Sequence, residues 1–259
     1  MSETDALRIY KLRNPILEYA WGSKTFISHL LGRDESSLEP QAELWMGDHP
    51  IVPSRIKINS SEISLSEIIK NEPYEMLGKN VADKFNNRLP FLFKVLAAAS
   101  PLSIQAHPNK TQAIKGFKLE NKRNIPSNSP ERTYKDDNHK PELICALTNF
   151  DAMCGFQPIK EIVERIKYLQ LEDNIPIIKE LDTDPSPRNL KRMFLELMSK
   201  HNDDQTKRVS VLINKLTEFG PRDDHEAIIF RWITKLAAIY PTDMGVFSPL
   251  FLNVVKLKE

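Results

Sequence analysis

Leu-Ser-Ile-Gln-Ala-His-Pro, residues 102–108, is the stretch that decides the fold. Polar and apolar residues alternate along it, and successive side chains of a β-strand point to opposite faces. One face would carry only polar groups, namely Ser103, Gln105 and His107. Apolar runs nearby, at residues 91–93 and 96–99, indicate that this strand is deep in the protein. The pattern therefore predicts a buried strand in a β domain.

The polar face of this strand needs partners, because burying polar groups without them is costly. A metal ion is one partner that the amide oxygen of Gln105 and a ring nitrogen of His107 can share. The alternative is a solvated strand face with one satisfied histidine. For a Gln-x-His pair taken alone, that simpler interpretation is favoured.

A second segment, residues 139–147 (His-Lys-Pro-Glu-Leu-Ile-Cys-Ala-Leu), leaves a polar loop and becomes apolar at once. Read as a strand over 142–147, it places Lys140 and Glu142 on one face. A carboxylate there can complete a ligand set of nitrogen and oxygen donors. An edge-strand ion pair of little energetic value is an equally good interpretation of the spacing.

The remaining sequence up to residue 157 has short apolar segments separated by Pro, Asn and Asp. The patterns predict strands over 55–59 and 89–97, and short helices at 64–70 and around Asp83. Residues 120–138 are rich in Asn, Ser and Pro, which predicts a long exposed loop.

After Pro158 the apolar residues recur at helical spacing in four stretches. Ser186-Pro187 is typical of a helix start, Gly220-Pro221 of a stop, and Asp223-Asp224 precedes the last helix. From Thr242 the pattern predicts β structure again, over 245–249 and 251–257. We therefore expect residues 1–157 to be the first part of a β domain, 158–241 a helical insertion, and 242–259 the return to that domain.

Composition narrows the class of protein. The 36 basic and 35 acidic side chains nearly cancel, which argues against capture of nucleic acid or of an anionic membrane. The first residues are polar and acidic, unlike a secretory signal, and the apolar runs are too short to span a bilayer. Cys145 and Cys154 lack a CxxC spacing, so reduced thiols in a cytoplasmic protein are expected.

Several motifs together resemble one family. Ser103–Lys110 (SIQAHPNK) and Asp136–Glu142 (DDNHKPE) are similar to the signature of type I mannose-6-phosphate isomerases. Further matches, in the family's order, are YAWG at 19–22, ELWMG at 43–47, LPFLFKVL at 89–96, FDAMCGFQ at 150–157 and GVFSPLFLN at 245–253. The resemblance covers nearly the whole chain.

This resemblance implies a cupin-type (jelly-roll) β-barrel with a helical insertion. It also implies a zinc-dependent enzyme, expected as a monomer, that interconverts mannose 6-phosphate and fructose 6-phosphate and so supplies mannose for GDP-mannose. By the same resemblance one Zn²⁺ is held by Gln105, His107 and Glu142. The family pattern places Lys140, His139 and Lys94 as catalytic candidates, and Ser103, Trp21 and Glu43 as residues that line the substrate pocket.

The implied chemistry suits these residue types. Moving a carbonyl between C1 and C2 requires proton transfer through an enediol, and a zinc ion stabilises the charge on the sugar oxygens. Lys140 is the first candidate for handling the proton. His139 is the second, with sugar-ring opening as its expected role, although strand alternation would turn it away from Glu142. Lys94 is either an outward snorkelling side chain or a cation for the anionic substrate.

Family members continue past the position of Glu259, where the resemblance implies a fourth zinc ligand, a histidine, and further strands. We therefore expect a chain truncated relative to the family, with an incomplete barrel. Three alternatives follow: a truncated ordinary isomerase, a catalytically impaired short form that only binds metal or sugar phosphate, and an iron oxygenase of the cupin type. The last is the weakest, because the Gln-x-His pattern differs from a two-His, one-carboxylate triad.

Overall fold

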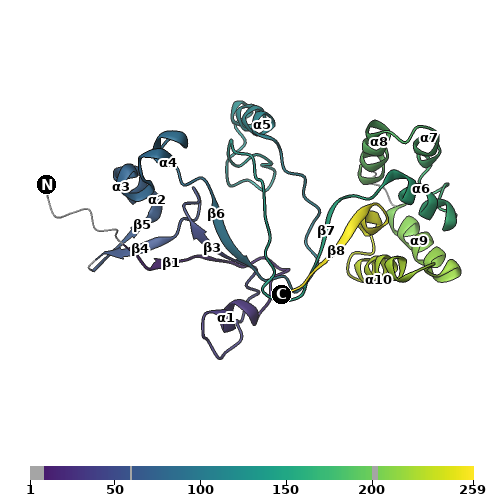
Figure 1. Cartoon of the computed structure of the whole chain (residues 1–259), viewed down its shortest axis with the longest axis horizontal. Helices are drawn as coiled ribbons and strands as arrows, with labels where there is room; N and C mark the ends of the chain where they lie inside the picture. The colour runs from purple at the N-terminus through teal and green to yellow at the C-terminus, as the bar shows by residue number, and fades with distance from the viewer. Residues whose placement is uncertain (1–8, 59, 200–203) are drawn as a thin grey trace. The chain divides into compact units, whose positions relative to one another are not determined.

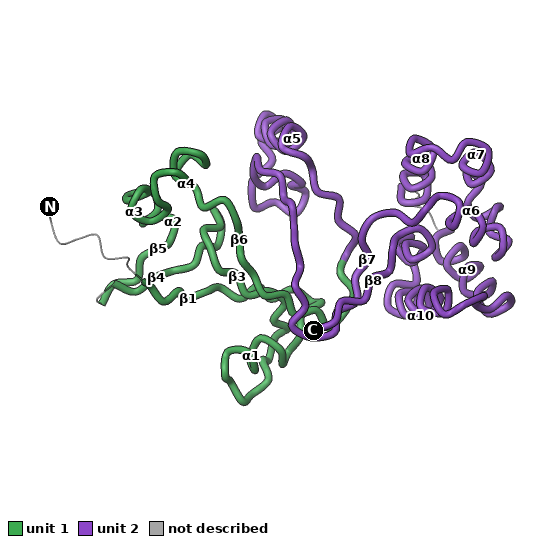
Figure 2. Tube along the Cα trace, viewed as in Figure 1, with its two compact units in different colours: residues 1–102 green, residues 103–259 purple. Residues whose placement is uncertain are grey.

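The computed structural model of the protein describes residues 9–58, 60–199 and 204–259. The chain divides into two compact units, residues 1–102 and residues 103–259 (Figure 2). Among the helices in the described ranges, none has the length and apolar character needed to cross a membrane.

The first unit contains two three-stranded antiparallel sheets. One has the order β1-β4-β5, formed by Leu12–Arg13, Arg55–Ile58 and Ser61–Ser64. The other has the order β2-β3-β6, formed by Ile16–Leu17, Glu43–Gly47 and Leu92–Leu96 (Figure 1). The register of the second sheet places Trp45 of β3 opposite Lys94 of β6. The strands predicted over 55–59 and 89–97 are thus confirmed over β4 and β6, while residue 59 lies outside the described residues.

The described residues of the first unit also form four short helices: α1 (Phe26–Leu30), α2 (Leu65–Asn71), α3 (Pro73–Leu77) and α4 (Lys79–Lys84). The helix predicted at 64–70 is confirmed as α2, whose N-cap Ser64 accepts a hydrogen bond from Ser66 N. The helix predicted around Asp83 is confirmed as α4. Such caps satisfy amide groups that have no partner within a helix.

In the second unit, the described part of residues 159–239 forms a block of five helices: α6 (Ile159–Tyr168), α7 (Ile178–Thr183), α8 (Pro187–Met198), α9 (Gln205–Phe219) and α10 (Asp224–Ile239). The four predicted helices are confirmed as α6, α8, α9 and α10. Ser186 is the N-cap of α8 and Gly220 ends α9, with a φ of 68°, as the sequence predicted. Asp223, which the sequence placed before the last helix, is the N-cap of α10. The apolar stripes meet in one core, whose fully buried members include Ile162, Ile166, Met193, Leu212, Ile229 and Ile233.

The helical block begins and ends at a pair of antiparallel strands, β7 (Phe150–Phe156) and β8 (Leu252–Leu257). The strand predicted at 251–257 is confirmed as β8. The β structure predicted at 245–249 is wrong, because Met244–Leu250 forms a 3₁₀ helix, η1. Asp243 caps η1 by accepting a hydrogen bond from Gly245 N, and Phe247 of η1 is fully buried in the helical core.

The strands predicted at 102–107 and 142–147 are wrong for this structure. Both segments are irregular, and neither pairs with a described strand. Neither segment is deep in the protein, since Ile104 is 41% exposed and Leu143 is 97% exposed. A strand is held by ladder hydrogen bonds to a neighbour, so alternation alone is not sufficient to form one. The described sheets hold three, three and two strands, and they form no closed barrel.

The exposed loop predicted at 120–138 is wrong in part. Its first residues belong to helix α5 (Lys110–Lys122), and Glu120 and Arg132 are buried. Asn109 begins α5 with a capping box, in which the Asn109 side chain accepts from Gln112 N and the Gln112 side chain accepts from Asn109 N. Few apolar residues occur in α5, so its sequence has a weak helical pattern.

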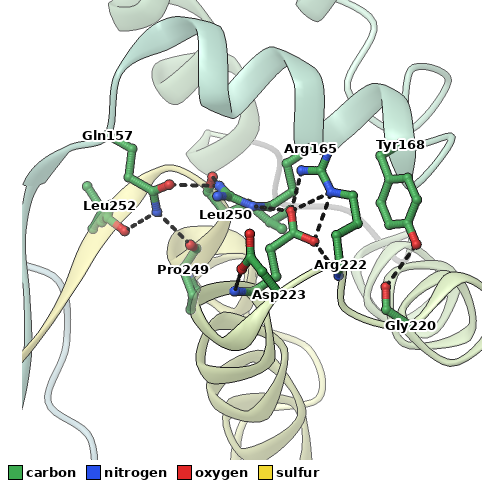
Figure 3. A network of polar contacts seen from close by, with 10 residues as sticks. Gln157, Arg165, Tyr168, Gly220, Arg222, Asp223, Pro249, Leu250 and Leu252 are labelled. Carbon is green, nitrogen blue, oxygen red and sulfur yellow. Dashed lines mark hydrogen bonds and ion pairs between the residues drawn. The ribbon is translucent and has the colours of Figure 1, made fainter.

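A buried polar network ties the helical block to the β7–β8 pair (Figure 3). Gln157 donates to Pro249 O at 3.1 Å and to Leu252 O at 2.6 Å, and its own oxygen accepts from Arg165 at 2.7 Å. Arg165 also donates to Leu250 O at 2.9 Å.

The same network includes a carboxylate between two arginines. Glu226 of α10 lies 3.4 Å from Arg165 Nε and accepts from Arg222 Nε at 3.0 Å. Tyr168 of α6 donates to Phe219 O at 2.7 Å, and Arg222 lies over its ring. The junction of η1 and β8 is thereby fixed against α6 and α10.

Acid should weaken this network. Burial raises the pKa of Glu226, but hydrogen bonds from Arg222, and the charges of Arg222 and Arg165, outweigh burial and hold the pKa below its ordinary value. A carboxylate with a lowered folded pKa stabilises the fold above its unfolded pKa, about 4.3, and this contribution is lost as pH falls through the folded value.

We therefore expect Glu226→Gln to unfold at lower urea concentration than the wild type at neutral pH. The difference should shrink as pH falls below about 4, where the wild-type carboxylate takes up its proton. Urea unfolding followed by circular dichroism at several pH values measures this. A difference that stays constant down to the lowest pH would contradict it.

Candidate metal and sugar-phosphate site

His107 is the centre of the candidate site. Its Nδ1 lies 2.9 Å from the backbone oxygen of Lys140. A carbonyl oxygen can only accept a hydrogen bond, so Nδ1 carries the proton. In the neutral ring the lone pair is therefore on Nε2.

The free nitrogen of His107 faces another acceptor. Its Nε2 lies 3.3 Å from Oε1 of Gln105. With the neutral ring protonated at Nδ1, both atoms are acceptors, and a cation between them would bind both lone pairs. Two ligands of a tetrahedral zinc ion lie about 3.4 Å apart for bonds of about 2.1 Å. The donor pair therefore fits a zinc ion, and the Nδ1 bond is the outer contact typical of metal-binding histidines.

Glu142 lies beside the same ring, but at its other nitrogen. Its Oε2 is 4.0 Å from His107 Nδ1. The structure thus places Gln105 and Glu142 on either side of the His107 ring. The Glu142 carboxylate, however, is not directed at Nε2. In the described part of the chain no group of three or more His, Cys, Asp and Glu side chains is placed to hold a metal. The candidate set therefore depends on the amide of Gln105, which the Gln-x-His spacing identified.

Lys140 has a contact that strand alternation did not predict, because its backbone rather than its side chain orients His107. Its ammonium lies 3.4 Å from Oδ2 of Asp136, four residues earlier in the sequence. His139 and Ser103 belong to the same unit and are both exposed.

The other three predicted site residues belong to the first unit. Glu43 of β3 lies 3.4 Å from Lys94 Nζ of β6, so these two form one polar cluster. Glu43 also accepts from Trp45 Nε1 at 2.6 Å, and Trp21 stacks on Tyr19 with ring centroids 5.6 Å apart. Trp45 is part of the ELWMG motif at 43–47 but was not among the predicted site residues. Its indole nitrogen, which needs an acceptor when buried, was the available signal.

The negative charge of Glu43 also acts on Tyr19. Burial, and then the charge of Glu43, raise the pKa of the Tyr19 hydroxyl, because both disfavour the phenolate. Tyr19 therefore stays protonated over the physiological range.

Glu43→Gln should lower the pKa of Tyr19 while leaving it above the ordinary value, because the charge is removed but the burial is kept. The ultraviolet absorbance of phenolate during alkaline titration measures this, with Tyr19→Phe in each background to isolate the Tyr19 signal. An unchanged Tyr19 midpoint would show that the carboxylate does not act on this hydroxyl.

Comparison with known proteins gives a consistent result. Residues 9–159 match the family described as phosphomannose isomerase type I, catalytic domain, and residues 162–252 match phosphomannose isomerase type I, helical insertion domain. The chain is 42% identical to the mannose-6-phosphate isomerase of Escherichia coli over 248 residues, and 34% identical to that of Homo sapiens over 272 aligned positions. These alignments cover 95% and 98% of the chain.

A solved structure is also similar. The mannose 6-phosphate isomerase of Salmonella typhimurium bound to fructose 6-phosphate and zinc superposes with a TM-score of 0.83 at 41% identity, over 96% of the chain. The chain spans about three fifths of the length of these relatives, 61% for the Escherichia coli protein and 62% for the human one.

Proposed function

Since the chain belongs to the type I phosphomannose isomerase family, we propose that it supplies the zinc-binding part of a site that interconverts mannose 6-phosphate and fructose 6-phosphate. The observation that carries this proposal is the facing pair of acceptors, Gln105 Oε1 and His107 Nε2, 3.3 Å apart. The zinc and fructose 6-phosphate bound in the Salmonella relative support the choice of metal and substrate.

In this proposal one Zn²⁺ is held by Gln105, His107 and Glu142. Glu142 would join the set by rotating its exposed side chain from Nδ1 toward Nε2, since 58% of that side chain is accessible. When bound, the metal supplies Lewis-acid stabilisation of the charge that develops on the sugar oxygens.

The chain's own residues would handle the substrate and the proton. Lys140 is adjacent to the site through its backbone bond to His107, so we assign its side chain the proton transfer between C1 and C2. His139 is assigned to sugar-ring opening and Lys94 to attraction of the anionic substrate. Ser103, Trp21 and Glu43 are proposed to line the pocket.

The wider proposal covers fold and setting. We propose that residues 1–157 and 242–259 contribute to a cupin-type barrel, and that residues 158–241 are an insertion in it. We propose a monomer in the cytoplasm that supplies mannose for GDP-mannose. The family membership and the helical block between β7 and β8 support this arrangement.

A second function has one observation in its favour. The two ligand segments are irregular and exposed, and Glu142 lies at Nδ1 rather than Nε2 of His107. A site of this kind is better suited to binding metal or sugar phosphate than to converting the sugar phosphate, because catalysis requires a pre-organised set of groups. The alternative proposal is therefore a binding protein with impaired turnover.

Zinc content tests the ligand assignment. The double variant Gln105→Ala, His107→Ala should lose the zinc that the wild-type chain retains, because both facing acceptors are removed. Inductively coupled plasma mass spectrometry of dialysed protein measures this. His225→Ala is the matched control, because His225 is an exposed histidine in the helical block and should leave zinc unchanged. Equal zinc in wild type and double variant would refute the ligand set.

Turnover tests the role of Lys140. Lys140→Met should keep zinc but lower kcat by about 10²- to 10⁴-fold, the usual loss of a general acid or base. Nuclear magnetic resonance of the conversion of mannose 6-phosphate measures this, with Lys135→Met as the control on the same exposed loop. If the wild-type chain binds zinc without any conversion, the binding-only alternative is favoured instead.

A further inference from the structure

The described segments that carry Gln105, His107 and Glu142 have no sheet partners, so something else must set their spacing. Helix α5 is connected to both. Its N-cap, Asn109, follows His107 by two residues, and the capping box fixes the chain there. The loop after α5 contacts the helix again through Arg132, Tyr134 and Asp137 before it leads into His139–Glu142.

The first contact between α5 and the returning loop is a buried ion pair. Glu120 of α5 lies 3.2 Å from Arg132 Nε, and both side chains are almost inaccessible, at 11% and 2% exposed. The Glu120 carboxylate also accepts from the backbone nitrogens of Thr133 and Tyr134, at 3.1 and 2.8 Å.

Arg132 holds the loop at several further points. It donates to the backbone carbonyl oxygens of Tyr134 and Ile125, at 2.7 and 2.5 Å, and to Asn121 Oδ1 at 2.6 Å. Its guanidinium also lies 5.0 Å from the ring centroid of Phe117 on α5. All these groups are local to α5 and its loop, so Arg132 fixes the loop's backbone rather than a distant element.

The second contact is a close approach at Gly116. A Cβ atom at this helical position would lie 2.5 Å from the ring of Tyr134, closer than carbon atoms can approach. The ring therefore packs directly on the helix backbone, at the place where Gly116 leaves room for it.

The third contact is at the start of the helix. Lys110 Nζ donates to the backbone oxygen of Asp137 at 2.9 Å and to Asn138 Oδ1 at 2.8 Å. These acceptors come directly before His139, so the first residue of α5 joins the two ligand segments next to the site itself.

We propose that α5 is a positioning element for the metal site, and that Glu120, Arg132, Gly116 and Lys110 set the spacing between the His107 and Lys140 segments. The inference rests on the proposed zinc-binding function. By this arrangement the three contacts keep the Lys140 carbonyl at His107 Nδ1, which leaves Nε2 free for the metal. These four are positioning residues, since the contacts described for them lie within α5 and the loop after it rather than at His107.

Two variants and one matched control test this proposal. Arg132→Met removes the guanidinium, while Gly116→Ala keeps the ion pair and displaces the Tyr134 ring. Gly116→Ala also favours the helix itself, because alanine has a higher helix propensity than glycine. Arg165→Met is the control, since Arg165 is an equally buried arginine, 3% exposed and paired with Glu226, in the helical block.

The first measurement is the tautomer of His107 in metal-free protein, from ¹⁵N shifts of the ring at a pH of about 8, where imidazoles are neutral. The wild type and Arg165→Met should show a proton on Nδ1 of His107. Arg132→Met and Gly116→Ala, the two α5 variants, should each show a mixture of tautomers. The second is zinc affinity by competition with a chelator. Both α5 variants should bind about 10- to 100-fold more weakly, and Arg165→Met as tightly as the wild type.

An unchanged tautomer and an unchanged zinc dissociation constant in both α5 variants would overturn the proposal. An equal loss of affinity in Arg165→Met would overturn it too, because general destabilisation would then be the cause. If the wild-type chain binds no zinc, the proposed function fails, but the tautomer measurement needs no metal and still decides whether α5 positions His107.

Discussion

The hydrogen bond between His107 Nδ1 and the Lys140 carbonyl joins two segments that are 33 positions apart in sequence. By fixing the proton on one ring nitrogen it determines which nitrogen can bind a metal, and in which direction that nitrogen points. The facing oxygen of Gln105 forms a metal-binding pair with Nε2 only when Nε2 carries a lone pair. A proton on Nε2 would turn the same contact into an ordinary hydrogen bond. The whole candidate site thus depends on one backbone acceptor being in the right place.

That acceptor is on a segment without a β ladder. In most β domains the spacing of two such segments is set by repeated backbone hydrogen bonds, which tolerate changes of side chain. Here the described contacts are made by a few side chains of α5 and the loop after it, centred on Glu120 and Arg132. A pair of this kind contributes specificity of geometry, and it is sensitive to the loss of either partner, because the other is then left buried and charged.

Local patterns in the sequence predicted what is local in the structure. The four amphipathic helices, the N-cap at Ser186 and the stop at Gly220 were predicted because each depends on neighbours within a few residues. Helix α7 was missed because it is only six residues long, and α5 because its apolar residues are few. Neither has a pattern strong enough to separate a helix from a loop.

The site itself was only partly predictable. The motifs identified Gln105, His107 and Glu142, and in the structure the side chains of Gln105 and Glu142 lie beside the ring of His107. The strands expected beneath them do not form, because a strand requires a partner and alternation within one segment carries no information about that partner. The Lys140 carbonyl was not predictable either, since every residue has a backbone oxygen and its role depends on tertiary placement alone.

The pairing of β7 with β8 determines which insertions and deletions such a chain can accept during evolution. Phe156 and Leu252 are register partners, so the two ends of the helical block leave the sheet as close neighbours, at about the 4.8 Å spacing of adjacent strands. A tight hairpin turn of two residues spans the same gap. Residues 157–251 can therefore be lengthened, shortened or exchanged for a turn without altering the path of the strands, as long as the replacement closes the apolar surface it exposes. The helical block is in this sense an exchangeable module. Its buried Gln157–Arg165–Glu226 network holds it to the strands, and an exchange would have to replace these contacts.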